Sequence, residues 1–426
     1  MIYIDCSEVV RNPHLHTGIQ RVVRNVASRL SLDSGCQAVA FMGFGFVAIN
    51  GLPSSSSILA VESEARRNRL ATIKSIKKQL AKIKILKYFF RTFIVPIVER
   101  WRRVAREISY IVGRISGKYD FVAIKDGDVF VSLDTNWYAD SFKAVRKLKK
   151  KGVVVITVVY DLIPINYPQY CDEYLCVVFE EWLGSAATIS NSFLTISLDA
   201  KKSLEDYLSS QGFSCQMPSD YFYLGADLAG AVELNNLVPR HDIVELCKKK
   251  VILTVGTIEP RKRHDLIVDG FRSSMLSEDG YILVCIGRNG WKVENFLADI
   301  KLAEDYQKSI YILHDITDAE LDIFYRNCEL LVFASDVEGF GLPLVEARMK
   351  GKRVLASDIP VFREIADHGV SFFEAGNALS LAKELPKVLS IQEDPGVMDW
   401  LTWDEASLQF LSKVKKMASL IDQKDC

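Results

Sequence analysis

Short apolar runs alternate with helical patterns along most of the chain. In the first half, runs that predict strands occupy residues 1–5, 38–41, 129–133, 153–160 and 188–190. In the second half they occupy residues 251–255, 281–286, 309–313, 330–334 and 353–356. Strands that alternate with helices are typical of parallel sheets in α/β domains. The pattern therefore predicts two such domains in succession.

Helical spacing and a change in composition predict the domain boundaries. Apolar residues at helical spacing after Thr17 and Gly18 predict a helix, and a second helical pattern covers residues 403–421. A charged, weakly periodic stretch over residues 226–250 separates the two series of strands and is the predicted linker. We expect a first domain at residues 1–225, a second at residues 251–400, and a final helix at residues 401–426.

Residues 61–118 do not follow this alternation. They hold 16 Lys and Arg against 4 Asp and Glu, a local charge of +12 in a chain of net charge −1. Apolar residues from Ile73 to Ile83 line one helical face, and an aromatic cluster begins at Tyr88. A basic amphipathic helix beside aromatic residues is typical of segments that lie in a membrane interface. The alternative is a helical insertion that packs on its own domain and keeps a solvated basic face.

The bulk composition excludes several classes of protein. The 426 residues suffice for two domains, and 49% hydrophobic with 25% charged residues is typical of soluble globular proteins. No run reaches the roughly 18 apolar residues of a spanning helix, and the N-terminus lacks the basic region of a signal peptide. Nine scattered cysteines without a CxxC pair favour a reducing compartment. We expect a cytoplasmic protein that does not bind nucleic acid, because no recognised nucleic-acid module is present.

The first chemistry-bearing stretch is Glu-Gly-Phe-Gly-Leu-Pro-Leu-Val-Glu, from Glu338 to Glu346, which follows a predicted strand. Pro343 suits the first position of a helix. Gly339 and Gly341 let the backbone approach a ligand closely. Free amides at a helix start bind anions, and the two carboxylates can accept hydrogen bonds from hydroxyls. This combination fits a ligand with phosphate, ribose and sugar. The alternative is a structural connection with surface acids.

The second stretch is Gly-Thr-Ile-Glu-Pro-Arg-Lys-Arg, at residues 256–263, between a predicted strand and a helical pattern that starts at His264. Arg261 and Lys262 place two cations at the turn from strand to helix. Such a pair can neutralise a diphosphate, on which negative charge develops as a sugar leaves. The alternative is a helix start that is stabilised by salt bridges.

These stretches resemble retaining GT-B glycosyltransferases of the family-4 type, and in particular bacterial O-antigen and capsule mannosyltransferases. The two glutamates match the family's Glu-x7-Glu motif, and residues 256–262 resemble its Gly-Thr-x-Glu-Pro-Arg-Lys signature. The chain departs from the family pattern at Thr257, where many relatives have Arg, and at Arg263, where many have Asn. The resemblance covers nearly the whole chain except residues 61–118, and it continues in residues 17–21, 286–291 and 356–364.

The resemblance implies a GT-B fold, with two doubly wound Rossmann-like domains that face each other across a cleft and a last helix that crosses back to the first domain. It implies that the first domain binds the acceptor and the second the nucleotide sugar. Glu338 would hold the sugar hydroxyls and Glu346 the ribose hydroxyls. The implied catalytic residues are Arg261, Lys262, Glu338 and Asp161. The implied donor-binding residues are Gly18, Gly256, Phe340, Gly341, Leu342 and Glu346.

Three of the candidate positions keep a second interpretation. Asp161 ends a strand of the first half, where catalytic residues of open α/β sheets collect, but it could equally cap a turn. Many relatives have His before this Asp, whereas this chain has Tyr160. Gly18 is either near the donor phosphates or a simple turn residue. Asp134 and Trp137 either border the acceptor or form a capped turn with a packed Trp.

The resemblance also implies the reaction. We expect transfer of a hexose with retention of configuration, without a metal or another cofactor, from GDP-mannose to a lipid-linked glycan. Rhamnosyl or other hexosyl transfer from a dTDP- or UDP-sugar is the alternative. The enzyme would work at the inner face of the cytoplasmic membrane, which residues 61–118 would contact. The two rival functions are a GT-B epimerase and a non-catalytic subunit that binds a nucleotide sugar.

Overall fold

The computed structural model describes nine parts of the chain: residues 1–13, 17–31, 35–43, 45–52, 120–135, 137, 139–213, 217–228 and 240–422. The predicted basic insertion at residues 61–118 lies outside them, as does part of the predicted linker. The chain divides into two compact units. The first comprises residues 1–158, 188–191 and 418–426, and the second comprises residues 159–187 and 192–417.

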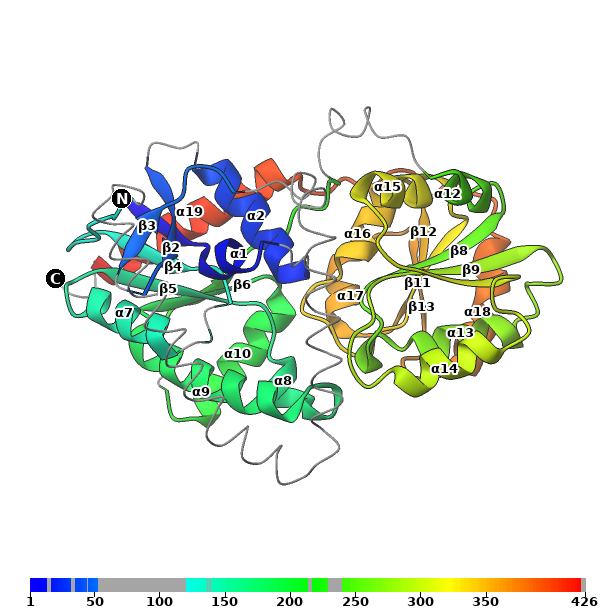
Figure 1. The fold of residues 1–426 in the computed structure, drawn as a ribbon, viewed down its shortest axis with the longest axis horizontal. Helices are drawn as coiled ribbons and strands as arrows, with labels where there is room; N and C mark the ends of the chain where they lie inside the picture. The colour runs from blue at the N-terminus through cyan, green and yellow to red at the C-terminus, as the bar shows by residue number, and fades with distance from the viewer. Residues whose placement is uncertain are drawn as a thin grey trace, which may run out of the picture. The chain divides into compact units, whose positions relative to one another are not determined.

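A seven-stranded sheet with the order β3-β2-β1-β4-β5-β6-β7 forms from the first half of the chain (Figure 1). Strands β2, β1, β4 and β5 pair in parallel, as do β6 and β7, whereas β3 runs antiparallel to β2. The strands are β1 (Ile2–Asp5), β2 (Cys36–Phe41), β3 (Phe46–Ala48), β4 (Val129–Ser132), β5 (Val154–Val159), β6 (Ser192–Thr195) and β7 (Ser219–Tyr221). This strand order is the doubly wound arrangement that the alternation of strands and helices predicts.

The helices of the first half are α1 (Ser7–Arg11), α2 (Gly18–Leu30), α7 (Ala139–Lys149), α8 (Ile163–Asn166), the 3₁₀ helix η2 (Pro168–Tyr170), α9 (Glu173–Ile189) and α10 (Leu198–Ser210). The predicted helix after Thr17 is confirmed as α2. Thr17 and Gln20 form a capping box there, because each side chain accepts a hydrogen bond from the backbone N–H of the other. The buried face of α2 consists of Val22, Val23, Val26 and Leu30.

The predicted strand at residues 188–190 is wrong. Thr188 and Ile189 form the last turn of α9, and the strand β6 begins only at Ser192. The β-branched pair Thr188-Ile189 has strand propensity, but a helix of 17 residues contains it. Tertiary packing thus overrides a local preference, as is common for short apolar runs.

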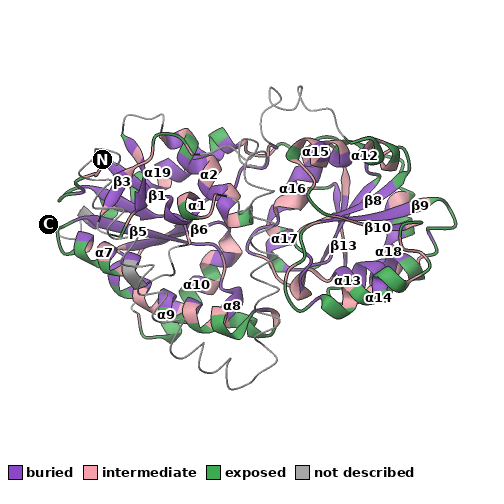
Figure 2. Cartoon of the chain, viewed as in Figure 1, coloured by how far each residue is buried: buried purple, intermediate pink, exposed green. Residues whose placement is uncertain are grey.

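A six-stranded parallel sheet with the order β10-β9-β8-β11-β12-β13 forms from the second half. Its strands are β8 (Lys250–Val255), β9 (Tyr281–Ile286), β10 (Ile310–Leu313), β11 (Leu330–Phe333), β12 (Arg353–Ser357) and β13 (Val370–Phe373). All five strands predicted for this half are confirmed, and β13 is an additional one. Strands β8, β9, β11 and β12 are almost wholly buried, as Figure 2 shows, which explains their continuous apolar sequences.

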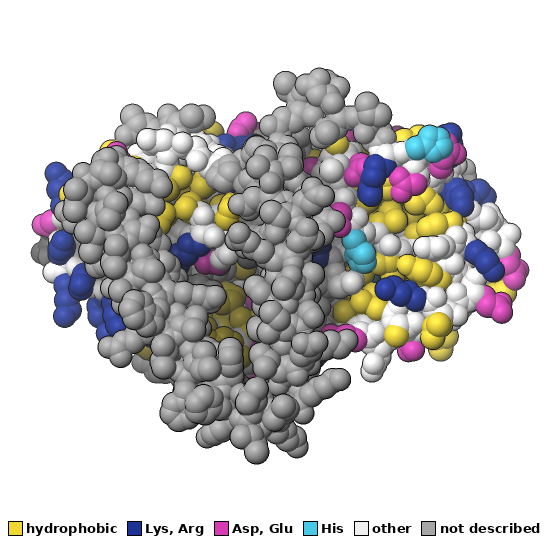
Figure 3. Space-filling model, viewed as in Figure 1, with side chains coloured by type: hydrophobic (Ala, Val, Ile, Leu, Met, Phe, Trp, Pro, Cys, Tyr) yellow, Lys and Arg dark blue, Asp and Glu magenta, His cyan; other side chains and the backbone are white. Residues whose placement is uncertain are grey.

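The helices of the second half are α12 (His241–Leu246), η3 (Pro260–Lys262), α13 (His264–Ser273), α14 (Glu294–Leu302), α15 (Asp318–Asn327), α16 (Leu342–Arg348), α17 (Pro360–Ile365), α18 (Ala378–Leu389) and α19 (Trp403–Asp422). The helix α12 occupies part of the predicted linker. Around this sheet, acidic and basic side chains are interspersed on the face shown in Figure 3. None of the helices in the described parts combines the length and the apolarity that crossing a bilayer requires.

The final helix α19 packs beside β7. Lys413 donates to both carboxylate oxygens of Asp220 at 2.9 Å, and the rings of Phe222 and Phe410 lie 4.9 Å apart. At the start of α19, Trp403 is 1% exposed and its N–H donates to Asp227. The chain thus returns from the second sheet to the edge of the first one.

Candidate functional site

The candidate site lies where two loops leave the second sheet. Strand β8 has β9 on one side and β11 on the other, so the strand order changes direction between β8 and β11. In open α/β sheets such a switch point opens a ligand crevice at the carboxyl ends of the strands. Two hydrogen bonds join the loops: Asp336 N–H donates to Arg261 O at 2.9 Å, and Arg261 Nη1 donates to Val337 O at 3.2 Å.

One carboxylate joins the two predicted diphosphate-binding cations. Glu338 Oε2 lies 2.6 Å from Arg261 Nη1, and Glu338 Oε1 forms an ion pair with Lys262 Nζ. Arg261 Nε also pairs with Glu259 Oε1 at 2.7 Å, and Ser335 Oγ donates to Glu338 Oε1 at 2.8 Å. We call Glu259, Arg261, Lys262 and Glu338 the charged cluster. It brings together three of the four predicted catalytic residues.

The charged cluster is shielded from water. The side chain of Arg261 is 20% exposed, that of Lys262 11% and that of Glu338 8%. Burial acts to raise the pKa of Glu338, but Arg261 and Lys262 outweigh burial and lower this pKa to about 2. Burial lowers the pKa of Lys262, and the Glu338 carboxylate opposes that effect. Glu338 is therefore ionised at neutral pH and compensates the two cations.

Backbone geometry shapes the turn that holds the cations. Gly256 leaves β8 with a φ of 148°, which side-chain-bearing residues rarely adopt. Arg263, between η3 and α13, has a left-handed φ of 52°. Asn tolerates this conformation better than most residues, so Arg at this position is unusual. Arg263 Nη1 instead contacts Asp336 Oδ2 at 3.2 Å, so its charge ties the turn to the β11 loop.

The loop after β9 lies against the same turn. Ile258 N–H donates to Arg288 O, and Gly290 N–H donates back to Ile258 O, both at 2.8 Å. A Cβ at Gly287 would lie 1.8 Å from the carbonyl oxygen of Gly256. Gly287 is therefore required for the close approach of the loops that follow β8 and β9.

Four further donor-binding candidates lie in the loop after β11 and in α16. Gly341, with a φ of 124°, is the N-cap of α16, and Leu342 is the first residue of that helix. Phe340 is 3% exposed. Glu346 is 2% exposed and accepts a hydrogen bond from Tyr325 Oη at 2.7 Å. Glu338 belongs to the charged cluster, whereas Glu346 bonds to Tyr325 outside it. Contact of Glu346 with a ribose stays a prediction.

Several residues that support the site were not predicted from the sequence. Glu259 belongs to the quoted Gly-Thr-x-Glu-Pro-Arg-Lys stretch, so its charge beside Arg261 was a usable signal. Ser335 and Asp336 precede Glu338 in the same loop. Tyr325 lies on α15, remote in sequence, and no pattern indicated its hydrogen bond to a buried glutamate.

Residues 240–399 match the family model described as "Glycosyl transferases group 1". The matched range contains strands β8 to β13 and the whole charged cluster.

The chain is also similar to bacterial enzymes that are named as mannosyltransferases. The chain is 24% identical over 331 residues to the serotype-specific mannosyltransferase WbdA of Escherichia coli, which covers 74% of this chain and 41% of WbdA. It is 29% identical over 167 residues to the O-antigen chain mannosyltransferase RfbU of Salmonella typhimurium, covering 36% of this chain and 45% of RfbU. This chain thus spans about two fifths of the length of the WbdA protein that it matches.

Solved structures share the fold of the whole chain. HepE of Anabaena, solved in complex with UDP and glucose, matches with a TM-score of 0.55 and 11% identity over 99% of this chain and 97% of HepE. Sucrose-phosphate synthase of Thermosynechococcus elongatus matches with a TM-score of 0.55 and 14% identity, over 99% and 97% of the two chains. The predicted GT-B fold class, with a Rossmann-like sheet in each half, is confirmed.

Asp161 lies in the second compact unit, close enough to the charged cluster to interact with Arg261 electrostatically. Its Oδ1 accepts the N–H of Ile163 at 3.0 Å, so the predicted turn contact is present. Burial raises the pKa of Asp161, and the charge of Arg261 partly offsets this effect. A Cβ on Gly339 would lie 3.1 Å from that of Asp161, which shows how closely the two loops pack. A contact of Asp161 with substrate stays a prediction.

Gly18 lies in the first compact unit as the first residue of α2. A Cβ built there would meet no atom within 4 Å, and the φ of Gly18 is not among the positive values. Neither packing nor the turn therefore requires glycine at this position. Its predicted approach to donor phosphates stays a prediction.

Asp134 is a structural carboxylate. It is 3% exposed, and it accepts backbone hydrogen bonds from Glu8 at 2.7 Å, Val9 at 2.8 Å and Thr135 at 2.8 Å. Of the two interpretations of Asp134, this geometry favours the capped turn.

Asp5 ends the neighbouring strand β1 and is wholly buried. Burial, and then the charge of Asp134, raise the pKa of Asp5 to about 7.

Protonation of this buried pair should make stability depend on pH. The folded-state pKa of Asp5 is about 7, and burial raises that of Asp134 to about 6; both exceed the unfolded value of about 3.9. The stabilisation is fully present below the unfolded pKa and is lost as pH rises through 6 to 7. We expect the free energy of unfolding to fall between pH 5 and pH 8, and to fall less in Asp5→Asn.

Urea unfolding at pH 5 and at pH 8 measures this difference in the free energy of unfolding. The exposed Asp120→Asn is the control, and equal slopes in all three proteins would contradict the prediction.

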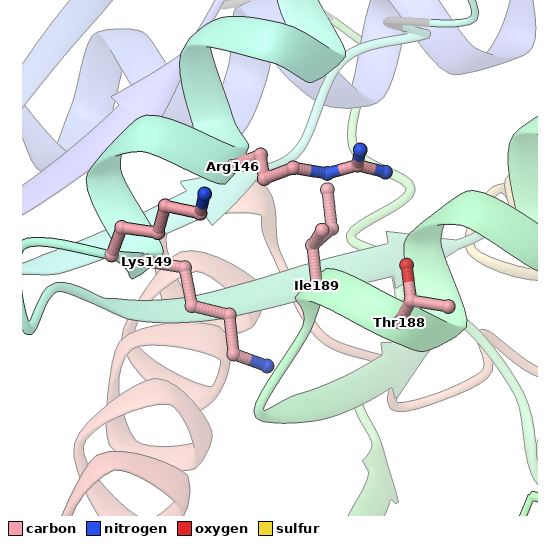
Figure 4. A pocket seen from close by; sticks show the side chains of 5 residues that line it. Arg146, Lys149, Thr188 and Ile189 are labelled. Atoms are coloured by element: carbon pink, nitrogen blue, oxygen red, sulfur yellow. The ribbon is translucent and has the colours of Figure 1, made fainter.

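A pocket of about 620 Å³ lies elsewhere, at the ends of α7 and α9 (Figure 4). Its lining consists of Arg146, Lys149, Lys150, Thr188 and Ile189. These residues precede the first residues of β5 and β6, at the amino edge of the sheet. None of the predicted site residues lines this pocket, so it is not the candidate site.

Proposed function

We propose that the chain is a retaining glycosyltransferase that moves mannose from GDP-mannose to a lipid-linked glycan during cell-surface polysaccharide synthesis. The charged cluster carries this proposal, because two adjacent, shielded cations at a switch point suit a nucleoside diphosphate. The enzyme works in the cytoplasm, at the inner face of the membrane. The relatives named as O-antigen mannosyltransferases support the choice of sugar.

Glu338 has two successive roles in the proposed reaction. In the structure, its carboxylate compensates Arg261 and Lys262. A bound diphosphate brings its own negative charge to these cations, and Glu338 is then free to accept hydrogen bonds from sugar hydroxyls. Exchange of one anion for another avoids leaving a buried charge without a partner, which would cost several kcal/mol.

In the reaction, the bond between the sugar's anomeric carbon and the β-phosphate oxygen breaks, and the acceptor oxygen forms the new bond to that carbon. The acceptor proton passes to a phosphate oxygen of the leaving diphosphate. Arg261 and Lys262 stabilise the charge that develops on this leaving group. The two side chains supply the positive charge that a metal ion would otherwise supply, so we propose a reaction without a metal.

The donor base is the least constrained part of the proposal. HepE, which shares the fold, was solved with UDP and glucose, so UDP-sugars are the first alternatives to GDP-mannose, followed by dTDP-rhamnose. Each candidate donor should be added to the purified chain and the melting temperature measured, since a ligand that binds only the folded state raises it. We expect the largest rise with GDP-mannose.

Turnover then tests the reaction itself. Release of GDP from GDP-mannose should require a glycan acceptor, and the product should keep the α configuration of the donor. Conversion of the sugar nucleotide without acceptor would identify an epimerase. A rise in melting temperature without any turnover would identify a binding subunit. Either result would contradict the proposed transfer.

A further inference from the structure

The segment from Tyr167 to Val177, which contains η2 and the start of α9, exposes large side chains to solvent. Tyr167 is 39% exposed, Tyr174 77% and Val177 55%. The rings of Tyr167 and Tyr170 are nearly parallel, with centroids 6.4 Å apart and 22° between their planes. Trp291, which is 36% exposed, donates from Nε1 to the Tyr170 carbonyl at 2.7 Å. We call Tyr167, Tyr170, Tyr174 and Trp291 the aromatic patch.

The aromatic patch is held in place by polar contacts. Tyr170 Oη donates to Asp336 Oδ2 at 2.6 Å, and burial together with this hydrogen bond raises the pKa of Tyr170 to about 12. Lys292 Nζ donates to the carbonyls of Gln169 at 3.3 Å and Cys171 at 2.9 Å. A surface whose backbone is already fixed loses little conformational entropy when a ligand binds. Exposed aromatic residues on a fixed backbone are typical of binding surfaces.

The segment that carries the three tyrosines of the aromatic patch has no basic residue of its own. Residues 152–200 contain no Lys, Arg or His, in a chain with 53 Lys and Arg. Four acids in this range are exposed: Asp172, Glu173, Glu180 and Glu181. Lys292, which contacts this segment from the loop after β9, is engaged with backbone carbonyls. The exposed acids of this segment therefore disfavour phosphate groups there, whereas a neutral ligand with hydroxyl groups would find carboxylate acceptors.

We propose that the aromatic patch binds the sugar rings of a neutral glycan chain, several residues away from the sugar that reacts. The C–H faces of a pyranose are apolar and pack on aromatic rings, while its hydroxyls donate to carboxylate and amide oxygens. The patch is continuous with the β11 loop, because Asp336 contacts Tyr170 and lies two residues before Glu338. The ligand class rests on the proposed function, since a glycosyltransferase has a glycan to hold.

Acceptors of increasing length test this proposal. Linear manno-oligosaccharides of two to eight residues should be compared as acceptors and, by saturation-transfer NMR, as ligands. In Tyr174→Ala we expect the KM for the longest oligosaccharide to rise about threefold to tenfold, as the loss of one stacked ring predicts. The kcat, the KM for the nucleotide sugar and the KM for the disaccharide should not change. Tyr174→Phe keeps the ring and should retain most of the long-chain affinity.

A matched control is Leu302→Ala, which removes an apolar side chain that is 85% exposed on α14. Equal effects of Leu302→Ala and Tyr174→Ala, or no effect of Tyr174→Ala at any length, would overturn the proposal. A wild-type dimer that Tyr174→Ala converts to a monomer would identify a self-association surface instead. Tyr174-dependent binding of manno-octaose without any transfer would refute the proposed function and leave the patch intact. Transfer that Tyr174→Ala does not affect would refute the role of the aromatic patch and leave the proposed function intact.

Discussion

Replacement of Lys262 by Ala should lower kcat/KM for the nucleotide sugar by roughly 10²–10³-fold, the usual effect of removing one group that stabilises a developing anion. Lys262 is only 11% exposed and lies against Glu338, so water cannot readily supply the stabilisation that its positive charge provides. Both kcat and kcat/KM should fall, since the interaction strengthens as the leaving group departs. Initial rates of nucleoside diphosphate release, measured with saturating acceptor, give both constants.

Two further variants separate charge from folding. Lys262→Arg keeps the positive charge and should recover part of the activity. Lys301→Ala removes an exposed lysine on α14 and should leave the rates at the wild-type level. If Lys262→Ala keeps wild-type kinetics, Lys262 does not contact the donor diphosphate. A lowered melting temperature in that case would identify the charged cluster as a structural ion-pair network.

Replacement of Arg348 by Ala should lower the free energy of unfolding by about 3–5 kcal/mol, the usual cost of breaking a buried ion pair. Arg348 is fully buried. Its guanidinium donates to Asp367 at 2.8 and 3.0 Å and to the carbonyls of Lys352 at 2.7 Å, Pro395 at 2.9 Å and Gly396 at 3.1 Å. The Ala variant leaves the carboxylate and three carbonyls without these donors. The midpoint of urea unfolding measures the loss.

The matched control is Arg272→Ala. Arg272 also forms a two-point ion pair, with Asp305 at 2.7 and 2.9 Å, but its side chain is 39% exposed. Exposed pairs contribute about 0–1 kcal/mol, so this variant should unfold close to the wild-type midpoint. Equal losses in the two variants would show that burial of Arg348 does not determine the contribution of its ion pair.

Local patterns predicted the second sheet well because its strands are buried on both faces. Strands such as β8 and β11 have continuous apolar sequences that are bounded by glycine or charged residues, and both are found as predicted. Short strands at the sheet edges, such as β3 with 3 residues and β13 with 4, lack this contrast and were not predicted. The error at residues 188–190 has the same cause, since three residues are too few to separate strand from helix.

The sequence by itself determined which residue types stand at the carboxyl ends of β8 and β11: two adjacent cations after one strand and a glutamate in the loop after the other. Their chemistry and their order follow from the chain, so the resemblance to a glycosyltransferase donor site was accessible without coordinates. The tertiary structure alone decided that Glu338 pairs with both cations, of which Lys262 is 76 residues away in sequence. It also decided that Arg263 binds Asp336 and that Tyr174 is exposed. Such contacts depend on sheet order and on burial, which arise only when distant segments pack together.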